Sequence, residues 1–219
     1  RYILELGSAE ERARVATTRA NSLLNSVLPP SVAAKVQREG KTYTVKAENC
    51  SILFADIVGF TKLSERLSAD ELVTLLNQIF SRFDQLTLKH GVEKIKTIGD
   101  GYLAVCGIPS PANDHAKRVV ALAIDMQRAM QEFEGLSIRI GINSGTVVAG
   151  IIGQTRIAFD LWGQAVNIAS RMESHGEIDR IQLTEETFEE VKDIYPFDEP
   201  RHIEVKGKGE MRVYLLSEQ

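Results

Sequence analysis

The chain has 219 residues, of which 43% are hydrophobic and 26% are charged, and its formal net charge at pH 7 is -4. This is the composition of a globular protein, and it excludes a chain that is disordered throughout. The small acidic excess argues against a nucleic-acid partner, because general nucleic-acid binders are ordinarily basic. No apolar run is long enough to span a bilayer, so no transmembrane helix is predicted.

The chain begins with Arg1 rather than Met and has no signal-peptide pattern, which predicts a piece of a longer protein. Cys50 and Cys106 each lie inside an apolar stretch. Two cysteines make neither a disulfide framework nor a four-cysteine metal site, so we expect thiols that fill core space in a cytoplasmic domain.

The first 42 residues are predicted to form a helical lead segment. Ser8–Glu11 fits a capping box that would begin a helix, and Pro29-Pro30 would end it near Leu28. Two interpretations stay open: a helix that pairs across a dimer axis, and a surface helix packed on its own domain. Both use the apolar stripe of Ala13, Ala16, Ala20, Leu23, Leu24 and Val27.

Residues 43–219 are predicted to form one domain. Hydrophobic periodicity favours strands at 43–45, 50–55, 93–98, 102–106, 137–143, 147–152 and 181–183, and a closing strand pair within 203–216. It favours helices at 31–37, 60–67, 69–90, 114–134, 164–174 and 185–192. Tight turns are expected at 99–101 and at Ser144-Gly145. The alternation predicts an α+β or α/β fold, with one mostly antiparallel sheet covered by helices.

Asp56 is the first candidate site residue, because it follows the apolar run 50–55 and we expect it to end that strand. A carboxylate there is costly unless it has a partner. It is either the N-cap of the next helix or a ligand, and the free N–H groups of that helix start are suited to phosphate.

Asp100 lies between Gly99 and Gly101 in a predicted hairpin turn, where aspartate is common. If neighbouring strands bring Asp56 and Asp100 together, they form a hard oxygen site for Mg²⁺ or Mn²⁺, completed by phosphate oxygens.

Asn167 and Arg171 are four residues apart and share one face of a predicted helix. A carboxamide beside a guanidinium suits a ribose and a phosphate. The other interpretation, a solvated polar face, fits less well because Val166, Ile168, Ala169 and Met172 are expected to surround the pair.

Four stretches together resemble, in order and spacing, the catalytic domain of class III nucleotidyl cyclases, over roughly residues 48–216: Phe54–Thr61, Lys94–Asp100, Asp160–Arg171 and Val205–Gly209. The segment Ser26–Ala33 is similar to the one that leads into such domains. The resemblance implies a ferredoxin-like antiparallel sheet with flanking helices, active as a head-to-tail homodimer with sites at the interface.

The resemblance also implies roles. Asp56 and Asp100 would hold two divalent metals per site, Mg²⁺ or Mn²⁺, assisted by the Ile57 carbonyl. Lys206 would contact the terminal phosphates. Backbone groups that would cradle the β- and γ-phosphates belong to Gly59, Phe60 and Thr61. Some relatives carry a phosphate-contacting Arg where this chain has Thr146, so that contact is not carried over.

By the same resemblance, Lys96 and Asp160 would bind the purine edge, Asn167 would orient the ribose, and Arg171 would stabilise charge at the transition state. Adenine presents an N6 donor and an N1 acceptor, which suit Asp160 and Lys96 respectively. Guanine reverses this edge, and guanylyl relatives carry Glu and Cys at these two positions. ATP is therefore the expected substrate, and cyclic AMP with pyrophosphate the expected products.

A geometric argument from the strand supports a dimer. At about 3.3 Å per residue, Lys96 and Asp100 lie roughly 13 Å apart along a straight strand. They therefore need not serve one nucleotide, and two composite sites in an isologous dimer accommodate both.

Three alternatives differ from an adenylyl cyclase. A guanylyl or mixed-purine cyclase disagrees with Lys96 and Asp160, and a non-catalytic dimerisation module is disfavoured because the expected site residues are all present. A diguanylate cyclase lacks its defining Gly-Gly-Asp/Glu-Glu-Phe signature here. None of the four histidines is expected to be catalytic. We expect a cytoplasmic catalytic domain joined to an upstream regulatory or membrane module.

Overall fold

The computed structural model describes residues 2–39, 43–153, 155 and 157–217, with the backbone alone for residues 2–10. The chain divides into two compact units: Arg1–Val45 with Gly150–Asp160, and Lys46–Ala149 with Leu161–Gln219. The boundary at residues 42 and 43 stays a prediction. Among the described residues, no helix combines the length and apolarity needed to cross a membrane.

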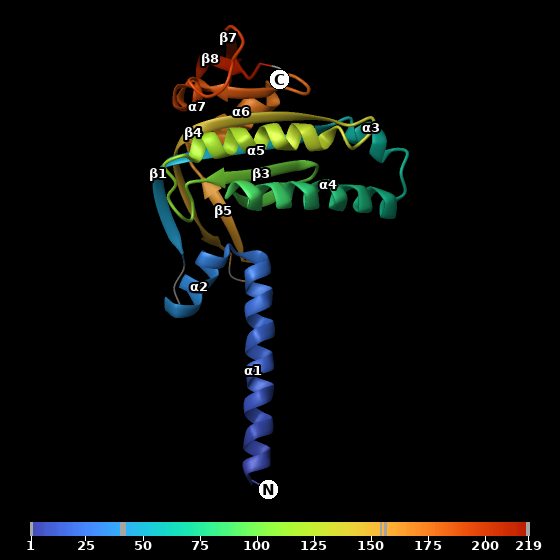
Figure 1. Ribbon diagram of the computed structural model, residues 1–219, viewed down its shortest axis with the longest axis vertical. Coiled ribbons are helices and arrows are strands. Elements are labelled where there is room, and N and C mark those ends of the chain that lie inside the picture. The colour runs from blue at the N-terminus through green and yellow to red at the C-terminus, as the bar shows by residue number, and fades with distance from the viewer. Residues whose placement is uncertain (1, 40–42, 154, 156, 218–219) are drawn as a thin grey trace. The chain divides into compact units, whose positions relative to one another are not determined.

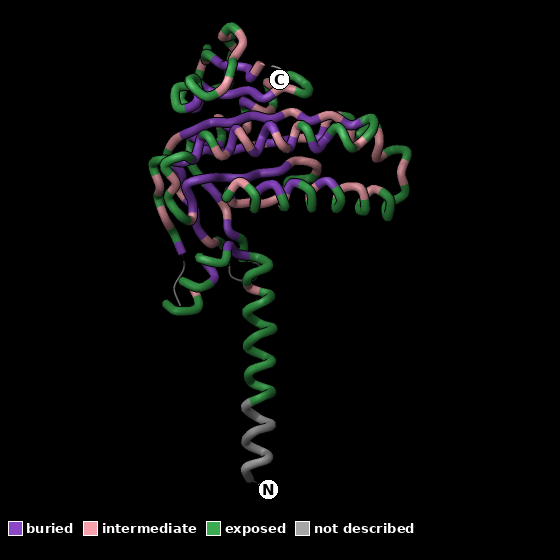
Figure 2. The backbone as a smooth tube through the Cα atoms, in the orientation of Figure 1, coloured by how far each residue is buried: buried purple, intermediate pink, exposed green. Residues whose placement is uncertain are grey.

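The smaller unit contains α1 (Tyr2–Val27) and α2 (Pro30–Glu39), which pack on each other. Helix α1 begins six residues before Ser8, so the prediction that Ser8 begins it is wrong. The side chain of Ser8 lies outside the described residues, and the carboxylate of Glu11 accepts hydrogen bonds from Arg14. Pro30 opens α2 at a first-turn position, where a missing N–H costs nothing. Leu23 and Val27 are 70% and 52% exposed, so the pairing of α1 remains a prediction. The described part of this helix is coloured mostly as exposed in Figure 2.

Within the described residues, eight strands form one sheet in the order β2-β3-β1-β4-β6-β8-β7, with β5 paired to β4. Strand β4 runs parallel to β6, while β1–β3, β2–β3, β6–β8 and β7–β8 are antiparallel. The predicted mostly antiparallel α+β fold is confirmed. The strands are β1 (Thr44–Val58), β2 (Glu93–Ile98), β3 (Gly101–Cys106), β4 (Ser137–Ile152), β5 (Ala158–Trp162), β6 (Ile181–Thr184), β7 (Arg201–Val205) and β8 (Gly209–Leu215).

Helices cover both faces of this sheet within the larger unit. Helices α4 (Ala69–His90) and α5 (His115–Met130) lie side by side on one face (Figure 1), against β2 and β3. The main core lies there and includes Phe83, Tyr102 and Ile140, each at most 1% exposed. Short helices α3 (Phe60–Ser64) and α7 (Glu185–Val191) complete this unit together with α6 (Gln164–Ser174).

Helix α6 lies on the opposite face from the main core. Side chains alternate along a strand, so the core-facing Ile140 and Ile142 of β4 leave Gly141 on the other face. A Cβ at Gly141 would lie 2.0 Å from the backbone nitrogen of Glu173 in α6. This strand therefore carries the α4–α5 core on one side and the backbone of α6 on the other.

Three strand predictions differ from the structure. Residues 44–45 and 50–55 belong to one long strand, β1, while residue 43 precedes it, and β5 was not predicted at all. The expected turn at Ser144-Gly145 is absent, because both residues lie within β4, a continuous strand of 16 residues. A Cβ at Gly145 would lie 3.2 Å from that of Ala165 in α6, so this glycine serves close packing rather than a turn. Cys50 and Cys106 are free and buried, as expected.

Candidate functional site

Asp56 lies inside β1, which continues to Val58, so the prediction that it ends the strand is wrong. The N-cap of α3 is Gly59, which excludes the N-cap interpretation of Asp56. Its neighbours Ala55 and Ile57 belong to the main core. Alternation therefore places the Asp56 carboxylate on the face of the sheet that α6 covers.

Asp100 follows Gly99 in the turn between β2 and β3, and Gly99 supplies the left-handed conformation with φ of +62°. In the pairing of β1 with β3, Asp56 lies opposite Gly101, the residue after Asp100. The sheet register thus brings the two aspartates to adjoining positions. Burial, with repulsion from Asp100 and Glu173, raises the pKa of Asp56 to about 6, against the opposing effect of Arg139.

Arg139 was missed by the sequence reasoning. Its guanidinium lies 3.6 Å from Asp56 and donates a hydrogen bond of 2.7 Å from Nε to Glu173 of α6. A charged residue inside the otherwise apolar start of β4 was a signal that could have found it. Arg139 therefore joins the aspartate pair to α6.

The donor set fits a divalent cation. Arg139 lies near the carboxylates of Asp56 and Glu173, and Asp100 adjoins Asp56. Burial is the main cause of the raised pKa of Asp56, and repulsion from Asp100 and Glu173 adds to it. Among the described residues, no three His, Cys, Asp or Glu side chains gather closely enough to hold a metal by themselves. Asp56 and Asp100 could thus hold a hard cation only with further oxygen ligands, such as backbone carbonyls or substrate phosphates.

The predicted phosphate loop follows β1 directly. Ile57 is buried with its side chain in the core, which leaves only its backbone for binding. Gly59 has a φ of +90°, and a Cβ there would lie 3.3 Å from the carbonyl oxygen of Gly135. Phe60 packs partly against the main core, while Thr61 is exposed.

Asn167 and Arg171 lie on α6, and both are exposed. The expectation that apolar residues surround them is wrong, because Val166, Ala169 and Met172 point inward from the buried face of an ordinary amphipathic helix. The two side chains therefore present a carboxamide and a guanidinium to solvent.

The remaining predicted residues lie on three different elements. Lys96 is partly buried on β2, next to a register irregularity that follows Lys94. The irregularity lies before Lys96, and the pairing with β3 is regular from Lys96 to Ile98, where the turn that holds Asp100 begins. Asp160 is partly buried on β5. Lys206 is exposed in the turn between β7 and β8, which Gly207 and Gly209 shape with φ of +82° and +78°.

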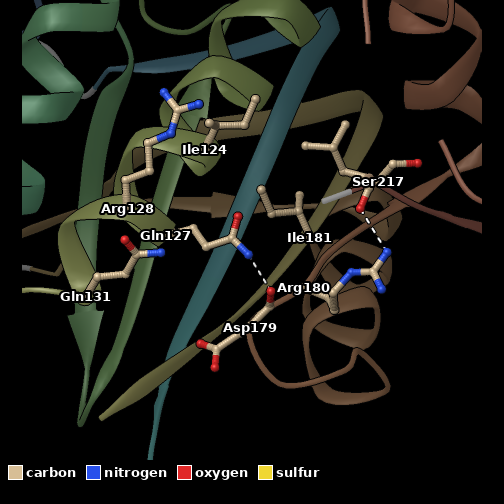
Figure 3. A pocket seen from close by; sticks show the side chains of 9 residues that line it. Ile124, Gln127, Arg128, Gln131, Asp179, Arg180, Ile181 and Ser217 are labelled. Carbon is tan, nitrogen blue, oxygen red and sulfur yellow. Dashed lines mark hydrogen bonds between the residues drawn. The ribbon is translucent and has the colours of Figure 1, made fainter. Parts of the chain in front are cut away.

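A cavity of about 290 Å³ lies between the end of α5 and the start of β6 (Figure 3). In it, Gln127 donates to the carbonyl oxygen of Asp179, and Arg180 donates to that of Leu216. None of the predicted site residues lines this cavity. Asn167 and Arg171 are instead exposed on α6, while the partly buried Asp56 and Asp100 adjoin at the β1–β3 pairing.

Comparison with known families decides the identity of the domain. Residues 42–218 match the model of the adenylate and guanylate cyclase catalytic domain. The chain belongs to this family. The predicted class III cyclase resemblance is confirmed, and the chain carries a nucleotide cyclase domain. Domains of this class generally use divalent metal ions, which agrees with the acidic edge at Asp56 and Asp100.

Relatives of this cyclase domain include both purine specificities. An adenylate cyclase of Mycobacterium bovis is 40% identical over 204 residues, covering 90% of this chain and 46% of the relative. The guanylate cyclase soluble subunit beta-2 of Rattus norvegicus is 36% identical over 219 residues, covering 97% of this chain and 32% of the relative. This chain thus spans less than half the length of either relative.

A solved structure similar to this cyclase domain is the catalytic core of a rhodopsin-guanylyl cyclase with converted specificity, in complex with ATPalphaS. It has a TM-score of 0.78 and 37% sequence identity, covering 82% of this chain and 100% of that one. Purine specificity thus varies among domains of one fold.

Proposed function

We propose that this domain is an adenylyl cyclase that converts ATP to 3′,5′-cyclic AMP and pyrophosphate. The observation that carries the proposal is the pair Lys96 and Asp160 in the purine-reading positions of the family motifs. A lysine donates to N1 of adenine and an aspartate accepts from its N6 amine. With guanine, the lysine would face the N1–H donor and the aspartate would face the O6 acceptor. Leaving such buried polar groups without hydrogen bonds costs a few kcal/mol of binding free energy.

The reaction is attack of the ribose 3′-hydroxyl on the α-phosphorus. Asp56, Asp100 and the Ile57 carbonyl hold two divalent ions, Mg²⁺ or Mn²⁺, which supply Lewis-acid activation of the hydroxyl and of the phosphoryl group. Asp56 and Asp100 suit this role because they adjoin across the β1–β3 register.

The other residues bind and orient the nucleotide. Backbone groups of Gly59, Phe60 and Thr61 hold the β- and γ-phosphates, and Lys206 pairs with the terminal phosphates. Asn167 orients the ribose while Arg171 stabilises negative charge at the α-phosphate. No nucleophilic side chain is needed, because positioning and electrostatic stabilisation carry most phosphoryl transfers.

The active form is a head-to-tail homodimer with two shared sites. Asn167 and Arg171 are exposed, which supports a site that a second copy covers. An isologous dimer then presents two equivalent composite sites. Whatever module lies upstream in the full-length protein would act through the arrangement of the two copies.

The deciding experiment measures turnover of ATP and of GTP with Mg²⁺ and with Mn²⁺ over a range of protein concentrations. We expect ATP to be preferred by ~10-fold or more in kcat/KM, and specific activity to rise with concentration as dimers form. Equal turnover of GTP would favour the mixed-purine alternative. If concentrated, demonstrably dimeric protein forms no cyclic nucleotide, the domain is a non-catalytic dimerisation module instead.

A second experiment tests the specificity residues directly. The double variant Lys96→Glu and Asp160→Cys carries the pair found in guanylyl relatives, and it should shift the ratio of kcat/KM for ATP over GTP toward GTP. An unchanged ratio in a folded, active variant would remove Lys96 and Asp160 from the purine site.

A further inference from the structure

Helix α6 lies against β4 at two glycines. A Cβ at Gly145 would lie 3.2 Å from the Cβ of Ala165, and one at Gly141 would lie 2.0 Å from the nitrogen of Glu173. Helix α6 thus lies close against β4 both near the start and near the end of the helix. Small displacements of α6 are costly in such close packing, because packed interfaces do not deform continuously.

Two buried side-chain amides bind the carbonyl groups of this helix. Asn143 of β4 donates from Nδ2 to the carbonyl oxygen of Ala165 at 2.9 Å, in the first turn of α6. Gln182 of β6 donates from Nε2 to the carbonyl oxygen of Met172 at 3.0 Å, near its last turn. Asn143 and Gln182 are 2% and 3% exposed. Buried amides of this kind lose solvation unless their bonds are kept, so they fix what they touch.

Thr184 determines which way the Asn143 amide points. Its hydroxyl donates to Asn143 Oδ1 at 2.7 Å, which leaves Nδ2 directed at Ala165. Thr184 has the backbone torsions of an N-cap for α7, with φ of -75° and ψ of 167°, but its side chain makes no capping bond. The single hydroxyl proton of Thr184 is therefore donated to Asn143, and the hydroxyl accepts no capping bond from α7.

On the other face of the sheet, hydroxyl groups form hydrogen bonds with the residue of β4 that follows Asn143. Ser144, next to Asn143, shares hydrogen bonds with Ser51 at 2.7 Å and with Thr187 at 3.0 Å. Ser51 in turn contacts His115 Nδ1 at 2.8 Å. All of these residues are buried, so β4 is fixed on both faces at the point where Asn143 reaches α6.

We propose that Asn143 is a positioning residue: its bond to Ala165, directed by Thr184, sets the place of α6 and thus of Asn167 and Arg171. The inference rests on the proposed function, in which those two side chains act on the ribose and the α-phosphate. Ala165 lies two residues before Asn167 on the same helix. Displacing a group that acts in the transition state by about 1 Å can cost ~100-fold in rate.

The test uses Asn143→Ala and Thr184→Val, with Thr184→Ser as the conservative variant that keeps the hydroxyl. Val119→Ala is the matched control, because Val119 is fully buried on α5 among the core residues of the other face. Each variant is measured for melting temperature, for kcat and KM with ATP well below that temperature, and for amide hydrogen exchange in residues 164–174.

We expect Asn143→Ala to lower kcat by ~10-fold or more with KM changed less than ~3-fold, since transition-state groups are displaced. Amide hydrogen exchange in residues 164–174 of Asn143→Ala should be faster than in the wild type. Thr184→Val should act the same way more weakly, and Thr184→Ser should restore both values. Val119→Ala should lower the melting temperature without either effect.

Two results would overturn the inference: a kcat in Asn143→Ala that matches the Val119→Ala control, or exchange in 164–174 that stays at the wild-type rate. Should Asn143→Ala fail to fold, the comparison of Thr184→Val with Thr184→Ser decides by the same two readouts. A wild-type protein without cyclase activity would reject the proposed function alone. The exchange measurement would then decide whether Asn143 fixes α6.

Discussion

The guanidinium of Arg139 lies 3.6 Å from the carboxylate of Asp56, on the face of the sheet that α6 covers. The same guanidinium is bonded to Glu173 of that helix. One guanidinium therefore lies near two carboxylates, while Asp100 adjoins Asp56. Burial raises the pKa of Asp56 to about 6, and repulsion from Asp100 and Glu173 contributes to the shift. This excess of negative charge is what a divalent ion would neutralise, and it leads to the first prediction.

Replacing either aspartate of the pair should abolish metal-dependent cyclisation. Asp56→Ala and Asp100→Ala each remove a hard oxygen ligand, and we expect kcat/KM for ATP to fall by ~100-fold or more. Cyclic AMP formation with Mg²⁺ and with Mn²⁺ measures this. The control is Asp84→Ala, a partly buried aspartate on α4 that pairs with Lys94 and Tyr102, which should keep most of its activity. Substantial activity in Asp56→Ala or Asp100→Ala would contradict the assignment of these aspartates as ligands of two metal ions.

Mixing two inactive variants should recover activity if the sites are shared. Lys96→Ala damages the purine site and Asp56→Ala the metal site, and a mixed dimer contains one site in which neither change is present. We expect recovery to approach a quarter of the wild-type activity when the chains mix freely, since about half of the dimers are mixed and each has one intact site. Cyclic AMP formation by the freely mixed chains measures this, and mixed dimers purified with two different tags should reach about half of the wild-type activity, since one of their two sites is intact. Proven mixed dimers without recovered activity would exclude sharing.

The sequence predicted those elements whose signals are local. Helix α4 has the predicted bounds because Ser68 and Glu71 form a capping box at one end and Gly91 adopts a φ of +63° at the other. The turn at Gly99 and the closing pair around Lys206 were likewise predictable from glycines that need positive φ.

The errors arose where the cause lies in tertiary contacts. Gly145 resembles a turn residue in the sequence, but its lack of a side chain admits Ala165 of α6. The direction of Asn167 and Arg171 followed from which face of α6 packs on β4, and periodicity could not separate the two faces because four apolar residues flank the pair. Arg139 gained its importance only from Asp56 and Glu173, which lie far from it in the chain.

Glu93 should make stability depend on pH in a definite window. Burial raises the pKa of Glu93 to about 7 from an ordinary value near 4.5. Between these values the unfolded chain loses the proton that the folded chain retains, so the contribution of Glu93 to stability falls as pH rises and levels off above about 7. Relative to wild type, Glu93→Gln should not change the free energy of unfolding at pH 4 and should raise it by about 1 to 2 kcal/mol at pH 8, because the partial exposure of Glu93 reduces the full effect of the shift.

Urea unfolding of wild type and Glu93→Gln at several fixed pH values measures this difference in the free energy of unfolding. Glu134→Gln, on the surface loop after α5, is the control and should show no such trend. A gain for Glu93→Gln of the same size at pH 4 and pH 8 would show that the effect comes from packing and not from ionisation.

Gly141→Ala should displace α6 and lower both stability and activity. The new Cβ would lie 2.0 Å from the nitrogen of Glu173 and 2.4 Å from the carbonyl carbon of Met172, both of them backbone atoms that no rotamer change can move. We expect a loss of ~3 kcal/mol or more in the free energy of unfolding, as for severe overpacking. Gly135→Ala is the matched control, because Gly135 has a φ of +77° and open space around it, so only the conformational cost of about 1 kcal/mol applies. A loss for Gly141→Ala no larger than that of the control would mean that α6 can move away from β4 at little cost. In that case the close packing of α6 on β4 at Gly141 would not be the cause of the positions of Asn167 and Arg171.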